Sequence, residues 1–459
     1  MSIPLAVDGE TDLDSNFFNP IIQAINTVPL TNIETALAQS NARVGVANVL
    51  DYGAVGDGST DDSQAFVDAI ADGYEIQIPA GKRYKVVDVE IPSHRALRGV
   101  KRGYESTSQG AIIQGVSGHS VFTFPSGVTT RGVSFDDLTI SGGDKGIVSP
   151  SWSYGISMRR VTLTNQQYAG IYCDGAIERW SLDFVAIEAL PGHTTSKGFQ
   201  LSDTTYSGEN YIDKCTFKDV RTSEGSHGWY IMGARGNSNT WINPVLNNHR
   251  VAGMHLRRKE ATVIINPNTE SNGGFVNPKF TTGSITTGTN SLVVASATGF
   301  SQGQTITVQG AGAGGIDLVT TISSIAGTTF TLADNASTSV TSKEVTNSTA
   351  DDFVFDNGGG TGLSHTMMIG GFFGDRLSQS GVRYAINGNG MNSLILIGSH
   401  ARHAPIYTPV NKATTFGVRA TFRPADTPPV VTGSRGSNAA LASLLTALAA
   451  EGLIQDGTS

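Results

Sequence analysis

Residues 46–70, VANVLDYGAVGDGSTDDSQAFVDAI, carry the strongest structural signal in the chain. A short apolar strand leads into a glycine-rich turn, after which Ser59 or Thr60 is placed to cap a helix. The first turn of that helix carries Asp61 and Asp62, and acidic side chains stabilise the positive end of a helix dipole. Three apolar residues then share one helical face, which predicts that this face packs on a core: Phe66, Ala69 and Ile70.

The strand expected next, EIQIP at 75–79, completes an order of strand, glycine turn, capped helix and strand. This order resembles the start of pectate-lyase-like β-helices, a family that includes many phage tailspikes and relatives of polygalacturonase. The resemblance implies an all-β fold, a right-handed parallel β-helix whose open end is closed by the short helix. It also implies structural rather than catalytic roles for Asp57, Asp61 and Asp62.

A repeated strand supports the same fold independently. The stretch Gly170-Ile-Tyr-Cys-Asp has echoes that begin at Gly198, Gly228 and Gly253, at intervals of roughly 25 to 30 residues. Repeats of this length, with two or three strands each, fit the coils of a β-helix and predict one over about residues 46–410. The two cysteines, Cys173 and Cys215, fall in alternating apolar strands, which favours core positions, although the sequence alone leaves a disulfide open.

The repeat is interrupted by a stretch rich in Thr, Ser and Gly that resembles a small β-domain inserted in phage tail proteins. Both chain ends carry short amphipathic helices, which are marginal alone and predict a homotrimer. The C-terminal one spans Asn438–Gln455, with Leu441, Leu444, Leu445 and Leu448 on one side. The expected organisation is a helical head for virion attachment at 1–45, β-helix at 46–279, the insert at 280–346, β-helix at 347–423, and a Pro-rich linker with an oligomerisation helix at 424–459.

Alternation along the repeated strands predicts which side chains face solvent. With Ile171 and Cys173 inward, Tyr172 and Asp174 point outward. Stacking of coils ~4.8 Å apart then predicts an outward ladder that can bind one oligosaccharide: Tyr172, Gln200, Tyr230 and His255, beside Asp174, Ser202, Met232 and Arg257. An ordinary solvated sheet face remains the alternative.

Cleavage of a glycosidic bond usually needs two carboxylates, ~5–5.5 Å apart for retention and ~6.5–9.5 Å apart for inversion. The candidates that we place at the edge of the ladder are Asp174, Glu188 and Glu270. A lyase would instead use a base such as His255 or Tyr230, with Arg257 holding a uronate. The mid-chain acidic pairs of polygalacturonases are not matched, since Asp136-Asp137 and Asp351-Asp352 stand in other contexts.

Composition excludes several classes of partner. The net charge is −8 and no block of Lys or Arg is present, so nucleic acid is not an expected partner. No signal peptide and no apolar stretch of membrane-spanning length are visible, which predicts synthesis in the host cytoplasm without membrane insertion. Cys and His show no zinc spacing, so we expect no metal or cofactor.

Three functions stay open at this point. The first is a tailspike depolymerase, a hydrolase or lyase that cleaves a capsular, exopolysaccharide or lipopolysaccharide glycan. The second is a spike that only binds such a receptor, and the third is a structural tail component. In each case the chain would be a virion part, joined to a tail or baseplate protein through its N-terminal segment. Fold alone does not separate them.

Overall fold

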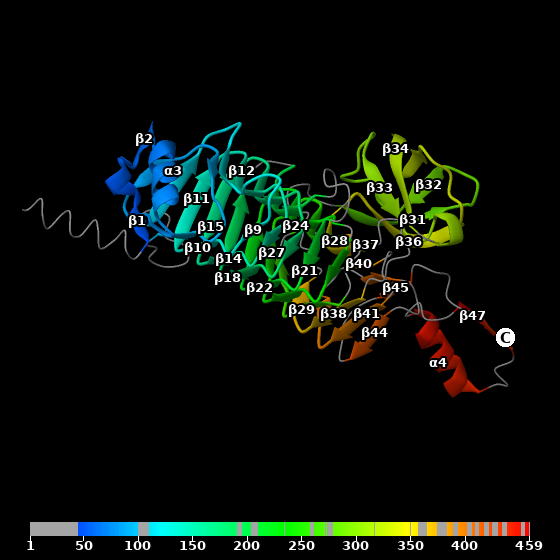
Figure 1. The fold of residues 1–459 in the computed structure, drawn as a ribbon. Helices are drawn as coiled ribbons and strands as arrows, with labels where there is room; N and C mark the ends of the chain where they lie inside the picture. The colour runs from blue at the N-terminus through cyan, green and yellow to red at the C-terminus, as the bar shows by residue number, and fades with distance from the viewer. Residues whose placement is uncertain are drawn as a thin grey trace, which may run out of the picture.

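The computed structural model describes residues 45–99, 110–190, 195–202, 210–233, 235–257, 261–270, 272, 279–315, 317–348, 350–356, 365–373, 383–388, 393–401, 406–408, 413–416, 422–424, 430–433, 438–450 and 455–458. These residues form a long parallel β-solenoid with a small barrel beside its later coils (Figure 1). The predicted parallel β-helix is therefore confirmed. The helix expected near the N-terminus falls outside the described residues.

The coils pass through three long sheets in turn, which we name A, B and C, and five of them also contribute a strand to a fourth sheet, D. Sheet A comprises β1 (Val46–Asn48), β3 (Glu75–Gln77), β6 (Ala96–Arg98), β10 (Ser134–Asp136), β14 (Ser157–Arg159), β18 (Ser181–Asp183), β22 (Thr216–Lys218), β26 (Thr240–Ile242), β29 (Thr262–Ile265), β38 (His365–Ile369), β41 (Ser393–Ile397) and β44 (Ala413–Phe416). Sheet B comprises β2 (Asp57–Asp61), β4 (Arg83–Lys85), β7 (Ala111–Gly115), β11 (Leu138–Gly142), β15 (Thr162–Gln166), β19 (Ala186–Ala189), β23 (Arg221–Ser223), β27 (Val245–Asn247), β30 (Asn268–Glu270), β39 (Phe372–Phe373) and β42 (His400–Ala401).

Sheet C comprises β5 (Val89–Glu90), β8 (Ser120–Thr123), β12 (Lys145–Ser149), β16 (Ala169–Cys173), β20 (Lys197–Leu201), β24 (His227–Ile231), β28 (Ala252–Arg257), β37 (Asp351–Asp356), β40 (Tyr384–Asn387), β43 (Ile406–Thr408) and β45 (Phe422–Pro424). Sheet D is shorter, with β9 (Thr130–Arg131), β13 (Ser153–Tyr154), β17 (Ile177–Glu178), β21 (Tyr211–Asp213) and β25 (Arg235–Asn237). All pairs within these sheets are parallel, so side chains at one position stack into columns along the solenoid.

In successive coils, one residue with a left-handed backbone conformation turns the chain from sheet A into sheet B. These corner residues have φ between 49° and 56°: Asp137, Arg160, Phe184, Asp219, Asn243 and Asn266. Their backbone N–H groups donate to the carbonyl of the coil that follows, as from Asp219 to Ile242 (2.9 Å). The corner is thus built by backbone hydrogen bonds, which lets its side chains project outward.

The interior is filled by apolar columns, with aromatic rings stacked between neighbouring coils. Phe199 and Trp229 lie parallel with ring centroids 5.0 Å apart, and Trp229 meets Trp241 edge-on at 5.7 Å. All three side chains are fully buried. Both cysteines are buried and unbonded, which settles the disulfide that the sequence left open.

The opening motif folds as the resemblance implied, with one correction. Helix α3 (Ser63–Asp72) begins at Ser63 with Asp62 as its N-cap residue, rather than with Ser59 or Thr60 as cap. The reason is that Asp57 accepts hydrogen bonds from the backbone N–H groups of Ser59 and Thr60, which holds this stretch in strand β2. The predicted apolar face of α3 is buried on the first coils.

The acidic residues of the motif have structural roles. Asp62 is buried and accepts from the backbone N–H groups of Val55 and Gly56. Asp61 accepts from the backbone and the hydroxyl of Ser63. Donated hydrogen bonds also lower the pKa of Asp57 and of Asp61.

The inserted β-domain is a closed antiparallel barrel with its own apolar core. Its strands are β31 (Phe280–Ile285), β32 (Ser291–Val294), β33 (Thr305–Val308), β34 (Leu318–Ala326), β35 (Thr329–Leu332) and β36 (Val340–Thr346). The barrel falls between β30 of sheet B and β37 of sheet C, where the other coils have a short corner. Beyond the solenoid lie α4 (Ala439–Ala450) and a two-stranded sheet of β46 (Val430–Gly433) and β47 (Gln455–Thr458) (Figure 1). None of the described helices has the length and apolar character needed to cross a bilayer.

Candidate functional site

The strands of sheet C pair in the register that the sequence predicted. Tyr172 pairs with Gln200, Gln200 with Tyr230, and Tyr230 with His255. The residues before them, from Ile171 to Met254, stack in the core without exposure. The ladder of outward positions therefore exists on consecutive coils.

The accessible part of this ladder is narrower than predicted. Tyr172, Tyr230 and His255 are half-buried, whereas Gln200 is only 6% exposed and its Oε1 has no hydrogen-bond partner among the described residues. In the second row, Asp174 and Arg257 are half-buried, but the positions between them are covered: Ser202 and Met232. Burial, followed by the charge of Asp174, raises the pKa of Tyr172, so this phenol stays protonated at neutral pH.

A second column, not predicted from the sequence, stands beside the ladder. Lys145 pairs with Ala169, Ala169 with Lys197, and Lys197 with His227 at the start of successive sheet C strands. Tyr168 has Lys145 Nζ and Lys197 Nζ each 5.2 Å from its ring centroid. Lys145 Nζ also lies 5.0 Å from the Tyr172 ring, and Lys197 Nζ lies 5.4 Å from the Tyr230 ring.

Strict alternation fails at these positions because the next residue is a core-facing glycine. A Cβ on Gly198 would lie 2.6 Å from Gly228 O and 3.2 Å from Thr222 Cγ2, an interior side chain. Gly198 and Phe199 therefore both face the core, and Lys197 stays on the outer face with Tyr230. Strict alternation puts Lys197 on the same face as Phe199, which is inward. The sequence therefore did not predict the outward position of Lys197.

Histidines complete the cluster. His227 packs on Tyr230 and His255, with ring centroids 4.6 Å and 5.9 Å apart. Burial, with further contributions from His255 and Lys197, lowers the pKa of His227 to about 2. Burial also lowers the pKa of Lys197. The ring of His227 is thus neutral at physiological pH, and the surface offers tyrosine faces, ammonium groups and imidazole nitrogens together.

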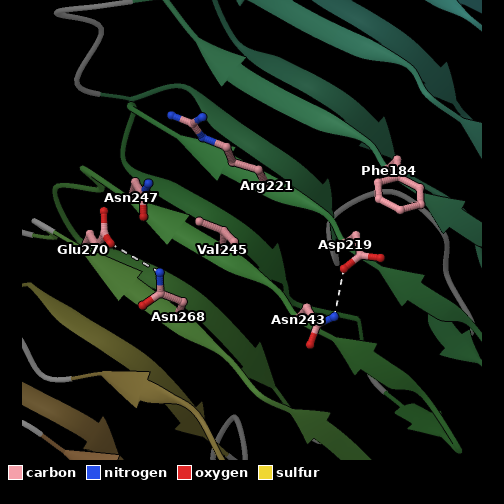
Figure 2. A pocket seen from close by; sticks show the side chains of 8 residues that line it. All are labelled: Phe184, Asp219, Arg221, Asn243, Val245, Asn247, Asn268 and Glu270. Atoms are coloured by element: carbon pink, nitrogen blue, oxygen red, sulfur yellow. Dashed lines mark hydrogen bonds between the residues drawn. The ribbon is translucent and has the colours of Figure 1, made fainter. Parts of the chain in front are cut away.

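An open groove of about 590 Å³ lies on the outer face of sheet B (Figure 2). Its lining includes Phe184, Asp219, Arg221, Asn247, Asn268 and Glu270. Asn243 Nδ2 donates to Asp219 Oδ1 (2.9 Å), and Asn268 Nδ2 lies 3.4 Å from Glu270 Oε1. Glu270 therefore belongs to the groove of sheet B and not to the ladder of sheet C.

The three predicted carboxylates are not brought together. Glu188 pairs with Ser223, Ser223 with Asn247, and Asn247 with Glu270, which places the two acids three coils apart, about 14 Å. That separation exceeds either glycosidase geometry. Asp174 follows β16 in sheet C, on another face of the coil.

Glu224, an acid not predicted from the sequence as a site residue, lies closer to Glu188. Glu224 follows Ser223, so it stands on the coil next to that of Glu188, at the corner between sheets B and C. Asn248 Nδ2 donates to Glu224 Oε1 (3.3 Å). Burial raises the pKa of Glu224, and the charge of Glu188 adds to this effect. In the sequence, Glu224 is only an acid followed by a glycine at the end of a strand. Many surface turns share this pattern, so it does not indicate a site.

The mid-chain acidic pairs are structural. Asp351 is buried and bonds Arg383, with Oδ2 2.8 Å from Nη2, and Asp352 accepts from Asn272 Nδ2 (2.6 Å). Asp136 and Asp137 pair with exposed arginines of the next coil. Across the described ranges, no three His, Cys, Asp or Glu side chains gather as a possible metal site.

Comparison with known proteins gives one similarity in sequence and several distant likenesses in fold. No known protein-family model matches the chain. A stretch of 52 residues is 50% identical to the pre-neck appendage protein of Bacillus phage B103, covering 11% of this chain and only 6% of that protein's length.

Among solved structures, a tailspike of Acinetobacter phage vb_AbaP_AS12 aligns over 85% of this chain and 59% of its own, with 10% identity and a TM-score of 0.41. An alginate lyase from Paenibacillus sp. str. FPU-7 aligns over 75% and 92%, with 13% identity and a TM-score of 0.42. An α-1,3-glucanase from Streptomyces thermodiastaticus aligns over 82% and 69%, with 10% identity and a TM-score of 0.40. These are distant likenesses, and the assignment of the fold rests on the strand pairing itself.

Proposed function

We propose that this chain is a phage tailspike that binds, and cleaves, a polysaccharide on the surface of its bacterial host, a capsule, exopolysaccharide or lipopolysaccharide. The observation that carries the proposal is the outward row of Tyr172, Tyr230 and His255 on sheet C, flanked by Lys145 and Lys197. Tyr230 and His255 stand on neighbouring coils, and the coil of the buried Gln200 separates Tyr172 from Tyr230. Aromatic faces beside hydrogen-bonding groups suit the apolar faces and hydroxyls of sugars. The short match to a phage appendage protein supports a place in the virion tail.

The assembly proposed for this function is a homotrimer attached to a tail or baseplate protein through residues 1–45. Leu441 and Leu444 of α4 are 39% and 55% exposed in the single chain. Apolar side chains exposed on one short helix are suited to a seam between copies. Three parallel solenoids would then present their sheets to a glycan.

Two carboxylate arrangements are proposed for cleavage. The first uses Glu188 with Glu224, because these acids stand on neighbouring coils. Burial and the charge of Glu188 raise the pKa of Glu224, which suits Glu224 to the role of general acid. The second treats Asp174 beside the ladder and Glu270 in the groove of sheet B as separate candidate sites, since they lie on different faces of the solenoid and do not form a pair. Gln200 and Arg257 would contribute to substrate binding only where a sugar reaches past the tyrosines.

A binding-only spike is the second candidate, favoured by one observation. The three acids predicted from sequence lie on separate faces or three coils apart, so they form no pair of catalytic spacing. The same outward ladder would then hold a receptor glycan without cleaving it.

The test uses labelled, purified full-length protein on a panel of bacterial strains, followed by spotting on lawns of the strains that bind it. We expect binding to encapsulated cells that is lost in their capsule-deficient or lipopolysaccharide-deficient derivatives, and a zone of clearing on the lawn. Tyr230→Ala should weaken binding about tenfold, since loss of ~1.4 kcal/mol of stacking corresponds to that factor. Tyr74→Ala is the matched control, an exposed aromatic that also stacks with a cation, Arg95, outside sheet C.

Cleavage is measured on polysaccharide extracted from the strain that binds. Release of reducing ends indicates hydrolysis, and ultraviolet absorbance of unsaturated products indicates a lyase. Glu188→Gln and Asp174→Asn should each be compared with wild type for folding and turnover. Binding without any product would leave the binding-only spike, and binding that survives loss of every surface polysaccharide would reject the proposed function.

A further inference from the structure

The column of lysines beside the ladder has an unusual electrostatic setting. Among the described residues, no carboxylate lies within 4.0 Å of the ammonium group of Lys145 or Lys197. The acid next in sequence, Asp144, accepts a hydrogen bond from the backbone N–H of Gly118 (2.8 Å). By contrast, Lys214 and Lys218 outside sheet C pair with Asp213 and Asp183.

The two ammonium groups face tyrosine rings in place of acids. Tyr168 and Tyr172 lie on the coil between them, and Tyr230 lies on the coil beyond Lys197. A tyrosine face attracts a cation but leaves its positive charge uncancelled. Lys197 is also half-buried, and burial makes its charged form costly. Its ammonium donates to the carbonyl of Thr195 (3.1 Å), which carries no formal charge, so a bound anion would supply the missing negative charge.

The spacing of the charges is fixed by the coils. Lys145 and Lys197 are aligned across one intervening strand, at Ala169, so their backbones are two coil steps apart, about 9.6 Å. A glycan lying along the solenoid covers that distance with about two sugars. Tyr168 and Tyr172, on the coil between the lysines, are in place to contact the sugar between two acidic groups.

We propose that the polysaccharide bound by sheet C is acidic and carries its carboxylates on alternate sugars, one held by Lys145 and the next by Lys197. This inference rests on the proposed function and adds the chemical class of the glycan. The chain as a whole carries a net charge of −8, which repels a polyanion. Affinity for such a glycan must therefore come from this local pair of lysines, and it should fall as salt screens them.

The experiment measures binding of the full-length protein to polysaccharide extracted from the strain identified by cell binding, in its native form and after chemical reduction of its carboxyl groups to alcohols. We expect reduction to weaken binding at least tenfold. Lys145→Gln and Lys197→Gln should each cause a similar loss on the native polymer and little change on the reduced one. Lys197→Arg should retain most of the affinity, since it keeps the charge, and Lys214→Gln is the control at a paired lysine away from sheet C.

Three results would overturn the inference while leaving the proposed function in place. They are a bound polysaccharide with no acidic groups, unchanged affinity after reduction, and lysine variants that bind the native polymer as wild type does. A protein that binds no bacterial polysaccharide at all would reject the proposed function itself. The two failures are therefore distinguishable.

Discussion

Replacing His249 with Asn should remove much of the acid sensitivity of the solenoid. His249 is fully buried at the corner between sheets B and C, with Nδ1 2.8 Å from Glu224 O and Nε2 3.1 Å from Thr222 Oγ1. A neutral ring fits these partners, because Nδ1–H donates to the carbonyl and Nε2 accepts from the hydroxyl. Burial lowers the pKa of His249 from 6.5 to about 4.

The sign of the pH effect follows from this lowered pKa. Above pH 6.5 the ring is neutral in the folded and the unfolded chain, so the free energy of unfolding does not depend on it. As the pH falls below 6.5 the unfolded chain takes up a proton that the folded chain refuses until about pH 4, and folding stability is lost across that window. Between pH 7.5 and pH 4.5 the loss due to His249 is about 2.5 kcal/mol.

The assay is urea unfolding at both pH values, followed by fluorescence of the buried tryptophans, of which Trp229 and Trp241 lie in neighbouring coils. His249→Asn keeps an amide donor for Glu224 O, and its loss of stability on acidification should be smaller than that of wild type by about 2.5 kcal/mol. His119→Asn is the control, since that half-exposed ring pairs with Asp88 at the surface. A His249→Asn variant that loses as much stability as wild type over this range would refute the reasoning.

Three further predictions concern the framework and the assembly. Gly198→Ala should destabilise the solenoid by about 1–3 kcal/mol, because the new methyl would lie 2.6 Å from Gly228 O. An unchanged midpoint of urea unfolding would show that the core has room for a methyl group at this glycine. Asp351→Asn should lower the free energy of unfolding by about 3–5 kcal/mol, since it leaves the charge of Arg383 without a partner. Asp183→Asn, at an exposed ion pair, should lower it by under about 1 kcal/mol. Equal effects of the two variants in urea unfolding would count against a buried network around Asp351. Leu441→Gln with Leu444→Gln should weaken the trimer measured by light scattering, and a wild-type monomer at micromolar concentration would exclude the seam.

The outward ladder was predictable because the alternate residues of the same strands are all apolar, which fixes which face of each strand lies inward. Shifting Trp229 or Phe199 to the surface would lose their burial and expose large rings, so only one register was acceptable. The solvent exposure of Gln200 was not predictable in the same way. Alternation tells which face of the strand a side chain takes, but not how far neighbouring side chains cover that face.

The lysine column was missed for a different physical reason. Period-two counting assumes that each residue uses one face of the strand, but the absence of a side chain at Gly170, Gly198 and Gly228 lets two consecutive residues face the core. The repeated glycines identified the fold, and Gly146 and Gly198 leave the lysine before each of them on the outer face, against tyrosine rings. Where a glycine recurs at the same place in each coil, the inward and outward positions should therefore be assigned separately before and after that glycine.

The positions of the acids depend on where each coil changes sheet. Glu188 and Glu270 share one column because each occupies the outward position near the end of a sheet B strand, while Asp174 follows a sheet C strand. The barrel follows β30, the strand that ends in Glu270, and replaces the short corner that leads from sheet B to sheet C in that coil. Glu270 therefore borders the insertion, whereas Glu188 and Glu224 lie at corners between sheets B and C that carry no insertion. Intact neighbouring coils are what hold a carboxylate pair at constant spacing, which makes Glu188 and Glu224 the first residues to substitute in a search for cleavage.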